Sequence, residues 1–288
     1  MEAMARPTIS KNPSRLVRAR HLVQAAFLAA SLGPFGLRLH YICGPAFHCY
    51  ACPLATFACP VGVLANFCAL GVAPFIALGT VIVAGALLGG FICGWVCPFG
   101  LVQDLLAKVP LPKLRLPVRA GYARYAVLVG LVLVVPYLYG ESHPLFICRV
   151  CPVGAMEAGL PAAGQALAAG ESFWAGMSTV KWVILGLFVV AALVKYRPWC
   201  TLFCPLGAML GLFNRAALVR LKVDDQKCIA CGACKKDCAI GLEPHRQLHD
   251  PLCIRCMECT RCDAVGVATA FSRDTQAEAE SEGDAAVS

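Results

Sequence analysis

The sequence predicts an all-α polytopic membrane protein with a small α+β domain at its C-terminal end. Of its 288 residues, 59% are hydrophobic and only 15% are charged, whereas soluble domains average about 25% charged residues. No Asp, Glu, Lys or Arg occurs between residues 39 and 103. The chain also contains 19 cysteines, an odd number that cannot pair completely into disulfides within one chain. An ordinary soluble globule and a disordered chain are therefore excluded.

Four apolar stretches are predicted to cross the membrane, because a helix needs about 20 apolar residues to span the hydrocarbon. They cover residues 21–39, 71–92, 122–139 and 179–196. The first stretch follows five basic residues, as a cleaved secretory signal would. It is longer than a usual signal core, however, and the internal repeat described below needs it. We therefore expect a retained helix.

The basic residues predict the orientation of these helices. Segments 1–20, 104–124 and 195–222 each carry five Lys or Arg residues, whereas segments 40–70 and 141–178 contain Arg149 alone. Because Lys and Arg collect on the cytoplasmic side of membrane proteins, both termini are predicted to be cytoplasmic. The net charge of +8 thus reflects topology. No basic stripe with interleaved aromatic residues supports binding of nucleic acid.

Eight cysteines near the C-terminus form two runs of closely spaced thiols. The runs are Cys228, Cys231, Cys234 and Cys238, and Cys253, Cys256, Cys259 and Cys262. In proteins with two [4Fe–4S] clusters, each cluster takes three thiolates from one run and the fourth from the other. Two clusters are therefore predicted, with Cys262 completing the first site and Cys238 completing the second. A single zinc site would use four thiolates and leave four idle.

Two further motifs have the pattern C-x3-C-P-x-G and fall at the cytoplasmic ends of the second and fourth predicted helices. Their cysteines are Cys93, Cys97, Cys200 and Cys204. Each motif is expected to offer one thiol from a last helical turn and one from the turn just beyond, because proline forces the residue before it out of helical geometry. Facing each other, the motifs would supply four thiolates to an inner site. An electron-carrying cluster and a structural thiol or zinc site both remain open.

A C-x2-C-P pattern occurs twice on the opposite side of the predicted membrane. Its cysteines are Cys49, Cys52, Cys148 and Cys151. The order helix, C-x2-C-P, helix, C-x3-C-P occurs twice, so the chain is predicted to be a two-fold repeat of parallel topology. Such a repeat brings equivalent loops together, and the two C-x2-C-P loops are therefore predicted to form an outer site. Disulfides are the alternative there if that side is oxidising. Cys59-Pro60-Val61-Gly62 also matches the stretch after Cys151, so Cys59 and Cys43 stay unassigned, whereas Cys68 fits a buried apolar residue.

Together these motifs resemble the membrane-bound ferredoxin-type proteins, a family that includes NapH-type and MauN-type proteins and cytochrome oxidase assembly ferredoxins. Residues 223–268 resemble bacterial two-cluster ferredoxins. They depart from that pattern at Ala239, where the family has proline, and in the x2 spacing before Cys262. The resemblance implies two [4Fe–4S] clusters, a bacterial cytoplasmic (inner) membrane location and exchange with the quinone pool.

The predicted organisation has four parts. They are a basic cytoplasmic N-terminus (1–20), a four-helix membrane domain with cysteine-rich loops (21–213), a ferredoxin-like domain with two [4Fe–4S] clusters (223–270) and a disordered acidic tail (271–288). One or two further iron–sulfur centres are expected at the inner and outer sites.

The predicted function is electron transfer between the quinone pool and a redox protein partner, as in a quinol dehydrogenase. Membrane lipid surrounds the helices in this interpretation, and quinone or quinol is the substrate. A gap of about 30 Å of hydrocarbon would separate the inner and outer sites. A metal-reducing assembly factor for an oxidase and a redox sensor are the alternatives. No dinucleotide-binding, P-loop or zinc-peptidase motif occurs.

Overall fold

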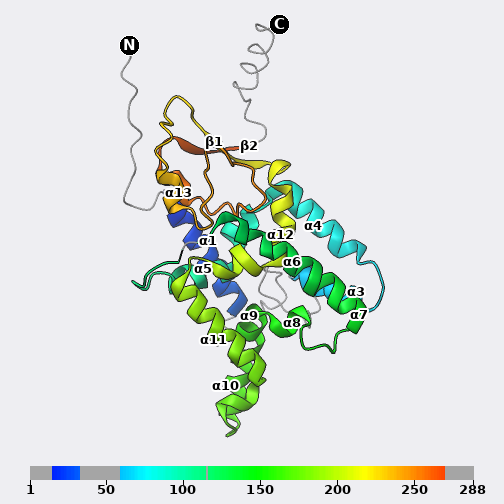
Figure 1. Ribbon diagram of the computed structural model, residues 1–288. Coiled ribbons are helices and arrows are strands. Elements are labelled where there is room, and N and C mark those ends of the chain that lie inside the picture. The colour runs from blue at the N-terminus through cyan, green and yellow to red at the C-terminus, as the bar shows by residue number, and fades with distance from the viewer. Residues whose placement is uncertain (1–14, 33–58, 115, 270–288) are drawn as a thin grey trace, which may run out of the picture.

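The computed structural model describes residues 15–32, 59–114 and 116–269. It is mostly helical, with one two-stranded sheet, as the sequence predicted. The sheet and α13 (Ala233–Asp237) lie at one end of the molecule, and α10 (Leu160–Ala168) lies at the opposite end (Figure 1). The helices between them carry the cysteine motifs.

One helix is long and apolar enough to cross a membrane. It is the continuous run Val118–Tyr139, which has 22 residues and a mean hydropathy of 1.6. It is built from η3 (Val118–Tyr122), α6 (Ala123–Val127), η4 (Leu128–Val134) and α7 (Val135–Tyr139). The predicted stretch 122–139 lies within it, so the helix extends beyond the predicted start.

The helices at the other three predicted stretches have bounds that differ from the predicted ones within the described residues. α4 (Phe75–Leu88) begins after Pro74, which cannot donate to a preceding turn, and ends at Gly89, whose φ of +55° breaks the helix. α11 (Thr179–Val194) ends before the predicted residue 196. α1 (Arg15–Leu32) begins six residues before the predicted stretch 21–39, and residues 33–39 lie outside the described part. The predicted ends were approximate, and α4 and α11 are each shorter than the apolar stretch that predicted them.

Four short helices each begin at the proline of a Cys–Pro pair. They are α3 (Pro60–Ala69), α5 (Pro98–Leu106), α9 (Pro152–Gly154) and α12 (Pro205–Leu212). Proline suits the first helical position because its missing N–H would have no helical partner there, and it holds the preceding cysteine in an extended conformation. The sequence thus fixes each cysteine as the N-cap of a helix.

Further short elements connect these helices. η2 (Ile92–Val96) and η7 (Trp199–Phe203) are single π-helical turns that precede α5 and α12. α8 (Ile147–Val150) precedes α9, and η5 (Ala155–Gly159) and η6 (Phe173–Gly176) flank α10. η8 (Phe213–Arg215) follows α12 and leads into the sheet.

The C-terminal domain contains the sheet and both cysteine runs. β1 (Val219–Val223) pairs antiparallel with β2 (Val265–Thr269), with Leu221 opposite Val267. β1 thus ends at residue 223, where the ferredoxin-like domain was predicted to start. The first run surrounds α13, and the second leads into η9 (Glu258–Arg261).

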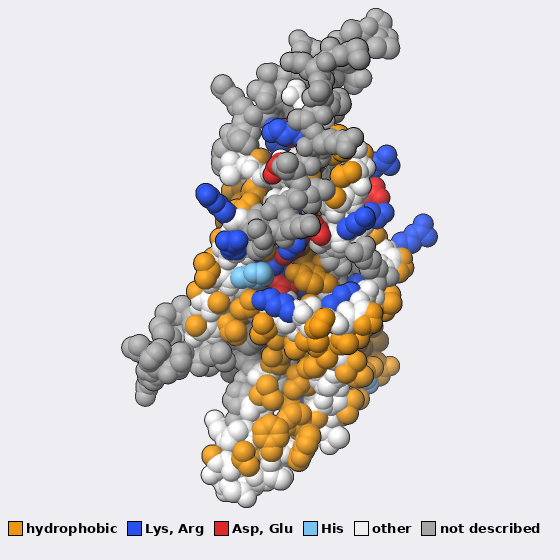
Figure 2. Space-filling view, turned by 90° about the vertical axis from the view of Figure 1, so that its left-hand side faces the viewer, with side chains coloured by type: hydrophobic (Ala, Val, Ile, Leu, Met, Phe, Trp, Pro, Cys, Tyr) orange, Lys and Arg blue, Asp and Glu red, His pale blue; other side chains and the backbone are white. Residues whose placement is uncertain are grey.

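The surface divides into an apolar and a charged part. Figure 2 shows hydrophobic side chains covering the end of the molecule away from the sheet, whereas Lys, Arg, Asp and Glu gather nearer the sheet. Large exposed apolar side chains include Phe75, Ile76 and Ile82 of α4 and Tyr137 and Leu138 of α7. This distribution suits a body whose apolar end, away from the sheet, contacts lipid.

The second cysteine run is packed tightly onto the helical body. Asn214 accepts a hydrogen bond from the amide of Gly90 (2.9 Å) and donates to the carbonyl oxygens of Asp250 (3.0 Å) and Cys253 (2.8 Å). A Cβ atom added at Gly94 would lie only 2.5 Å from the carbonyl oxygen of Ile254. Glycine at position 94 therefore lets the loop that carries the second cysteine run approach η2.

Four buried arginines lie at this contact, and three of them hydrogen-bond across it. Arg20, Arg124, Arg197 and Arg255 are among the largest fully buried side chains of the described residues. Arg20 donates to the carbonyl oxygen of Cys256, and Arg124 donates to that of Pro251. Arg255 donates from the loop to the carbonyl oxygens of Asn214 and Val219. Most of these contacts are charge-assisted hydrogen bonds, which are stronger than neutral ones.

We predict that Asn214→Asp weakens this attachment. The carboxylate still accepts from Gly90 but cannot donate to the two carbonyl oxygens, and each unsatisfied buried group costs about 1–3 kcal/mol. Proteolysis within residues 226–250 should therefore become at least about tenfold faster in the detergent-solubilised full chain. An unchanged rate would show that Asn214 does not hold the loop.

We also predict that Gly94→Ala displaces the second cysteine run. The added methyl group meets backbone atoms of Ile254 and Arg255, which cannot move as a flexible side chain can. Gly79→Ala is the matched control, because a Cβ atom at Gly79 meets nothing within 4 Å. Iron release to a chelator should be faster in Gly94→Ala than in Gly79→Ala. Equal rates in the two variants would contradict the close approach.

Candidate metal centres

Nearly all the described cysteines line one of three cavities. The first cavity is lined by Cys228, Cys231, Cys234 and Cys262. The second is lined by Cys238, Cys253, Cys256 and Cys259. These are the two sets that the sequence paired, each with three thiols from one run and one from the other. Of the described cysteines, only Cys68 lines none of the three cavities.

The two runs have the same unusual backbone. In the first run Ala230 and Gly232, which flank Cys231, have φ values of +51° and +71°. In the second run Arg255 and Met257, which flank Cys256, have φ values of +48° and +60°. Positive φ is uncommon outside glycine and marks backbone held by a functional constraint. Alternation of right- and left-handed residues turns amide groups toward one concave side, where they bind anions such as cluster sulfides.

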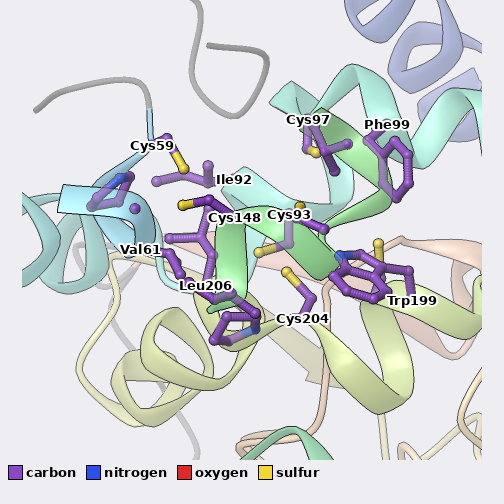
Figure 3. Close-up of a pocket in the computed structure, with 18 residues that line it drawn as sticks. Cys59, Val61, Ile92, Cys93, Cys97, Phe99, Cys148, Trp199, Cys204 and Leu206 are labelled. Atoms are coloured by element: carbon purple, nitrogen blue, oxygen red, sulfur yellow. The ribbon is translucent and has the colours of Figure 1, made fainter. Parts of the chain in front are cut away.

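The third cavity has a volume of about 90 Å³ and contains both C-x3-C-P motifs. Its cysteines are Cys59, Cys93, Cys97, Cys148, Cys151, Cys200 and Cys204. Figure 3 shows the sulfur atoms of Cys93 and Cys204 directed toward one another, with those of Cys59 and Cys148 on the side of Ile92. Thus the structure brings together the four inner cysteines, as predicted from their repeated motif, and adds three more.

The two inner motifs have nearly identical geometry. Cys97 has φ −67° and ψ 111°, and Cys204 has φ −71° and ψ 111°. Each amide closes a π turn, Cys97 to the carbonyl oxygen of Ile92 (3.1 Å) and Cys204 to that of Trp199 (2.8 Å). The predicted change from helix to turn at the second cysteine is therefore present, although the turn before it is π rather than α. π turns often mark functional sites.

The inner thiols are surrounded by hydrogen-bond donors and cations. The Gln103 side-chain amide donates to the sulfur of Cys200 (3.1 Å). The Nε and Nη1 atoms of Arg124 and the Nη1 atom of Arg197 are buried without a hydrogen-bond partner among the described residues. Both arginines interact electrostatically with Cys93. Unpartnered cationic donors beside four thiols fit an anionic thiolate-ligated cluster.

The buried thiols need a cation in order to ionise. Burial raises the pKa of Cys97 to about 12, and burial likewise raises the pKa of Cys253 to about 12. A bound metal reverses this penalty because its charge stabilises the thiolate. The donor set at both positions consists of soft sulfur ligands, which select Fe–S clusters, Zn²⁺ or Cu(I).

The outer site differs from its prediction. Cys49 and Cys52 lie outside the described residues, as does Cys43. Cys148 and Cys151 do not lie across the hydrocarbon from the inner cysteines but line the same cavity. Because α8 and α9 are short helices packed against α11, they turn this motif into the interior. Cys59 lines the cavity too, and its match to the stretch after Cys151 was the sequence signal for it.

Sequence reasoning missed a buried ion-pair network next to these sites. Asp104 accepts hydrogen bonds from Arg197 (2.6 Å to Oδ1) and Arg20 (3.0 Å to Oδ2), and Arg20 also contacts Glu258 (2.9 Å). Burial alone would raise the pKa of Asp104, but Arg197, His21 and Arg20 together hold it well below its usual range. Asp104 therefore stays ionised. In the sequence, Arg20 and Arg197 lie in basic segments beside predicted membrane helices, so they were interpreted only as positive charge at a membrane surface.

Among the described residues, no group of three or more His, Cys, Asp or Glu side chains converges closely enough to hold a single metal ion.

Sequence comparison finds two matches to a 4Fe-4S binding domain, at residues 70–117 and 180–224. Each match contains one C-x3-C-P motif. No solved structure matches the chain significantly.

Three relatives illustrate the similarity. An uncharacterized protein of Methanocaldococcus jannaschii is 28% identical over 75% of this chain and 88% of its own length. The ferredoxin-type protein NapH of Haemophilus influenzae is 28% identical over 66% of this chain and 64% of its own. The methylamine utilization ferredoxin-type protein MauN of Methylorubrum extorquens is 32% identical over 67% of this chain and 58% of its own.

The match to this chain therefore spans less than two thirds of the NapH and MauN relatives. The two 4Fe-4S binding domain matches include both C-x3-C-P motifs, whose backbone geometry is nearly the same. These similarities and the matched 4Fe-4S binding domain show that the chain is similar to the NapH- and MauN-like ferredoxin-type proteins and contains two 4Fe-4S binding domain segments.

Proposed function

We propose that this protein moves single electrons between the quinone pool and a redox protein partner through a series of iron–sulfur clusters. The observation that carries the proposal is the packing of the second cysteine run against the inner motif. Gly94, between Cys93 and Cys97, lies under the carbonyl groups of Ile254 and Arg255. Two sets of thiols therefore meet at one interface, where centres bound to them would exchange electrons.

The C-terminal cysteines would hold two [4Fe–4S] clusters. Cys228, Cys231, Cys234 and Cys262 would ligate one, and Cys238, Cys253, Cys256 and Cys259 the other. The left-handed residues between the cysteines support this assignment, because they direct backbone amides toward the cluster sulfides. When bound, such clusters accept and release one electron at a potential set by charge, burial and hydrogen bonding.

The inner cysteines would hold a further cluster. Cys93, Cys97, Cys200 and Cys204 line one cavity, and the cationic side chains of Arg124 and Arg197 lie near them. A nearby positive charge favours the reduced, more negative form of a cluster. These arginines would therefore raise the reduction potential of the inner cluster relative to an uncharged site.

The membrane assignment extends the same proposal. Four helices would cross the bacterial cytoplasmic membrane, with both termini and the C-terminal domain on the cytoplasmic side. The exposed apolar side chains of α4 and α7 and the matched backbone of the two inner motifs support a lipid-embedded body with a two-fold repeat. Quinol would give up two electrons in turn to one-electron centres and release its protons at the membrane surface.

We predict that Cys93→Ser and Cys200→Ser each lower the iron content of the anaerobically purified chain by about four atoms, because each removes one ligand of the inner cluster. Cys68→Ser is the matched control and should retain full iron content, because Cys68 lines none of the three cavities. Full iron content in both inner variants would contradict an inner cluster.

We also predict that a quinol analogue reduces the purified protein. Electron paramagnetic resonance should show reduced cluster signals after anaerobic addition of the quinol to the full chain in detergent. Dithionite provides the positive control, because it shows which signals the clusters can give. If dithionite reduces the clusters and no quinol analogue does, the protein is not a quinol dehydrogenase.

A further inference from the structure

We propose that Cys59, Cys148 and Cys151 bind a second iron–sulfur centre in the cavity that contains the inner cysteines. This inference rests on the proposed function for the type of metal centre, and it assigns a site that the two inner motifs do not include. The three cysteines belong to separate places in the sequence. Only the fold brings them to one cavity.

Cys151 repeats the local structure of the inner cysteines, and Cys59 shares its position before a helix-starting proline. Cys151 has φ −82° and ψ 120°, close to the values of Cys204, and it precedes the proline that begins α9. Its carbonyl oxygen accepts from the amide of Ala155 (3.3 Å), as that of Cys204 accepts from Ala208 (3.2 Å). Cys59 likewise precedes the proline that begins α3 and accepts from Val63 (3.2 Å).

The third thiol comes from α8, which packs against α3. Cys148 and Cys59 both pack against the hydrophobic core that contains Cys93. In Figure 3 the sulfur atoms of Cys59 and Cys148 lie together beside Ile92, on the side of the cavity away from Trp199. Cys59 and Cys148 therefore lie together in this cavity, apart from the facing sulfur atoms of Cys93 and Cys204, and Cys151 lines the same cavity three residues after Cys148.

The chemistry of the cavity favours a thiolate-ligated centre. Among the described residues that line it there is no carboxylate and no histidine, so the ionisable ligands that these residues offer are all sulfur. The remaining wall is apolar, with Val61, Ile147 and Val153 beside the three thiols. Soft thiolates in an apolar setting select iron–sulfur clusters over hard cations such as Mg²⁺ or Ca²⁺. A C-x2-C pair with one distant cysteine gives three protein ligands to such a centre.

This placement changes the route of electrons through the protein. The predicted separation of outer and inner sites by about 30 Å of hydrocarbon would prevent direct exchange. Two centres in one cavity exchange one electron directly: the donor centre is oxidised, the acceptor centre is reduced, and no bond or proton moves. With the second cysteine run packed on η2, the chain would then hold a continuous series from the Cys148 site to the C-terminal domain.

The test compares iron and acid-labile sulfide in the anaerobically purified full chain and in three variants, Cys59→Ser, Cys148→Ser and Cys151→Ser. Each variant should lose about three to four irons per chain and keep the electron paramagnetic resonance signals of the C-terminal clusters. The control is Cys68→Ser, because Cys68 lies on α3, the helix that begins directly after Cys59. This variant should lose no iron. Full iron content in the three variants, or loss of zinc or copper in place of iron, would overturn the proposal.

A second measurement on the unmodified chain covers variants that fail to fold. Cysteines that ligate a cluster resist alkylation by iodoacetamide until acid and a chelator remove the iron. Peptide mass spectrometry should show Cys59, Cys148 and Cys151 protected together with Cys93. Alkylation of the three while Cys93 stays protected, or a disulfide between Cys148 and Cys151, would refute the site. Loss of quinol reduction with this protection intact would instead refute only the proposed function.

Discussion

The structure depends on buried guanidinium groups that tie the second cysteine run to the ends of the helices. Arg20 and Arg124 donate to carbonyl groups of the loop, while Arg197 is held by Asp104. A buried charge is tolerated only where it is paired or hydrogen-bonded, so Arg20 and Arg124 favour the backbone position that they contact. Movement of the loop would take a carbonyl acceptor from each of these two guanidinium groups. A cluster ligated by Cys253 and Cys256 would therefore keep a constant distance from the inner thiols.

The same arginines link architecture to redox chemistry. Thiolate-ligated clusters are anionic, and an apolar interior would penalise that charge strongly. Arg197 interacts electrostatically with Cys200 and with Cys256, so one guanidinium lies between two candidate centres. Asp104 reduces the net positive charge at this position and remains ionised. If clusters are bound at these sites as proposed, the balance between these two residues would tune both centres together, because net charge and burial set cluster potentials.

Much of the chemistry could be predicted from the sequence, because it depends on local spacing. The cysteine runs and the Cys–Pro pairs fix short backbone segments, and the structure contains both. Helix boundaries were less predictable, since Pro74 and Gly89 shorten α4 inside a continuous apolar stretch. The burial of Arg20 and the joining of Cys59 to Cys148 could not be predicted, because both arise from contacts between distant segments. Basic residues near a predicted membrane face were interpreted as topology signals, although several are internal ion-pair partners.

The cysteines act as ligands of inorganic centres in this account, and the most direct test is to locate the iron atoms. Crystals of the anaerobically purified chain, measured at the iron absorption edge, would give anomalous density at each iron. The account predicts peaks in all three cysteine-lined cavities. Cavities without iron density, with the cysteines joined in disulfides, would contradict it.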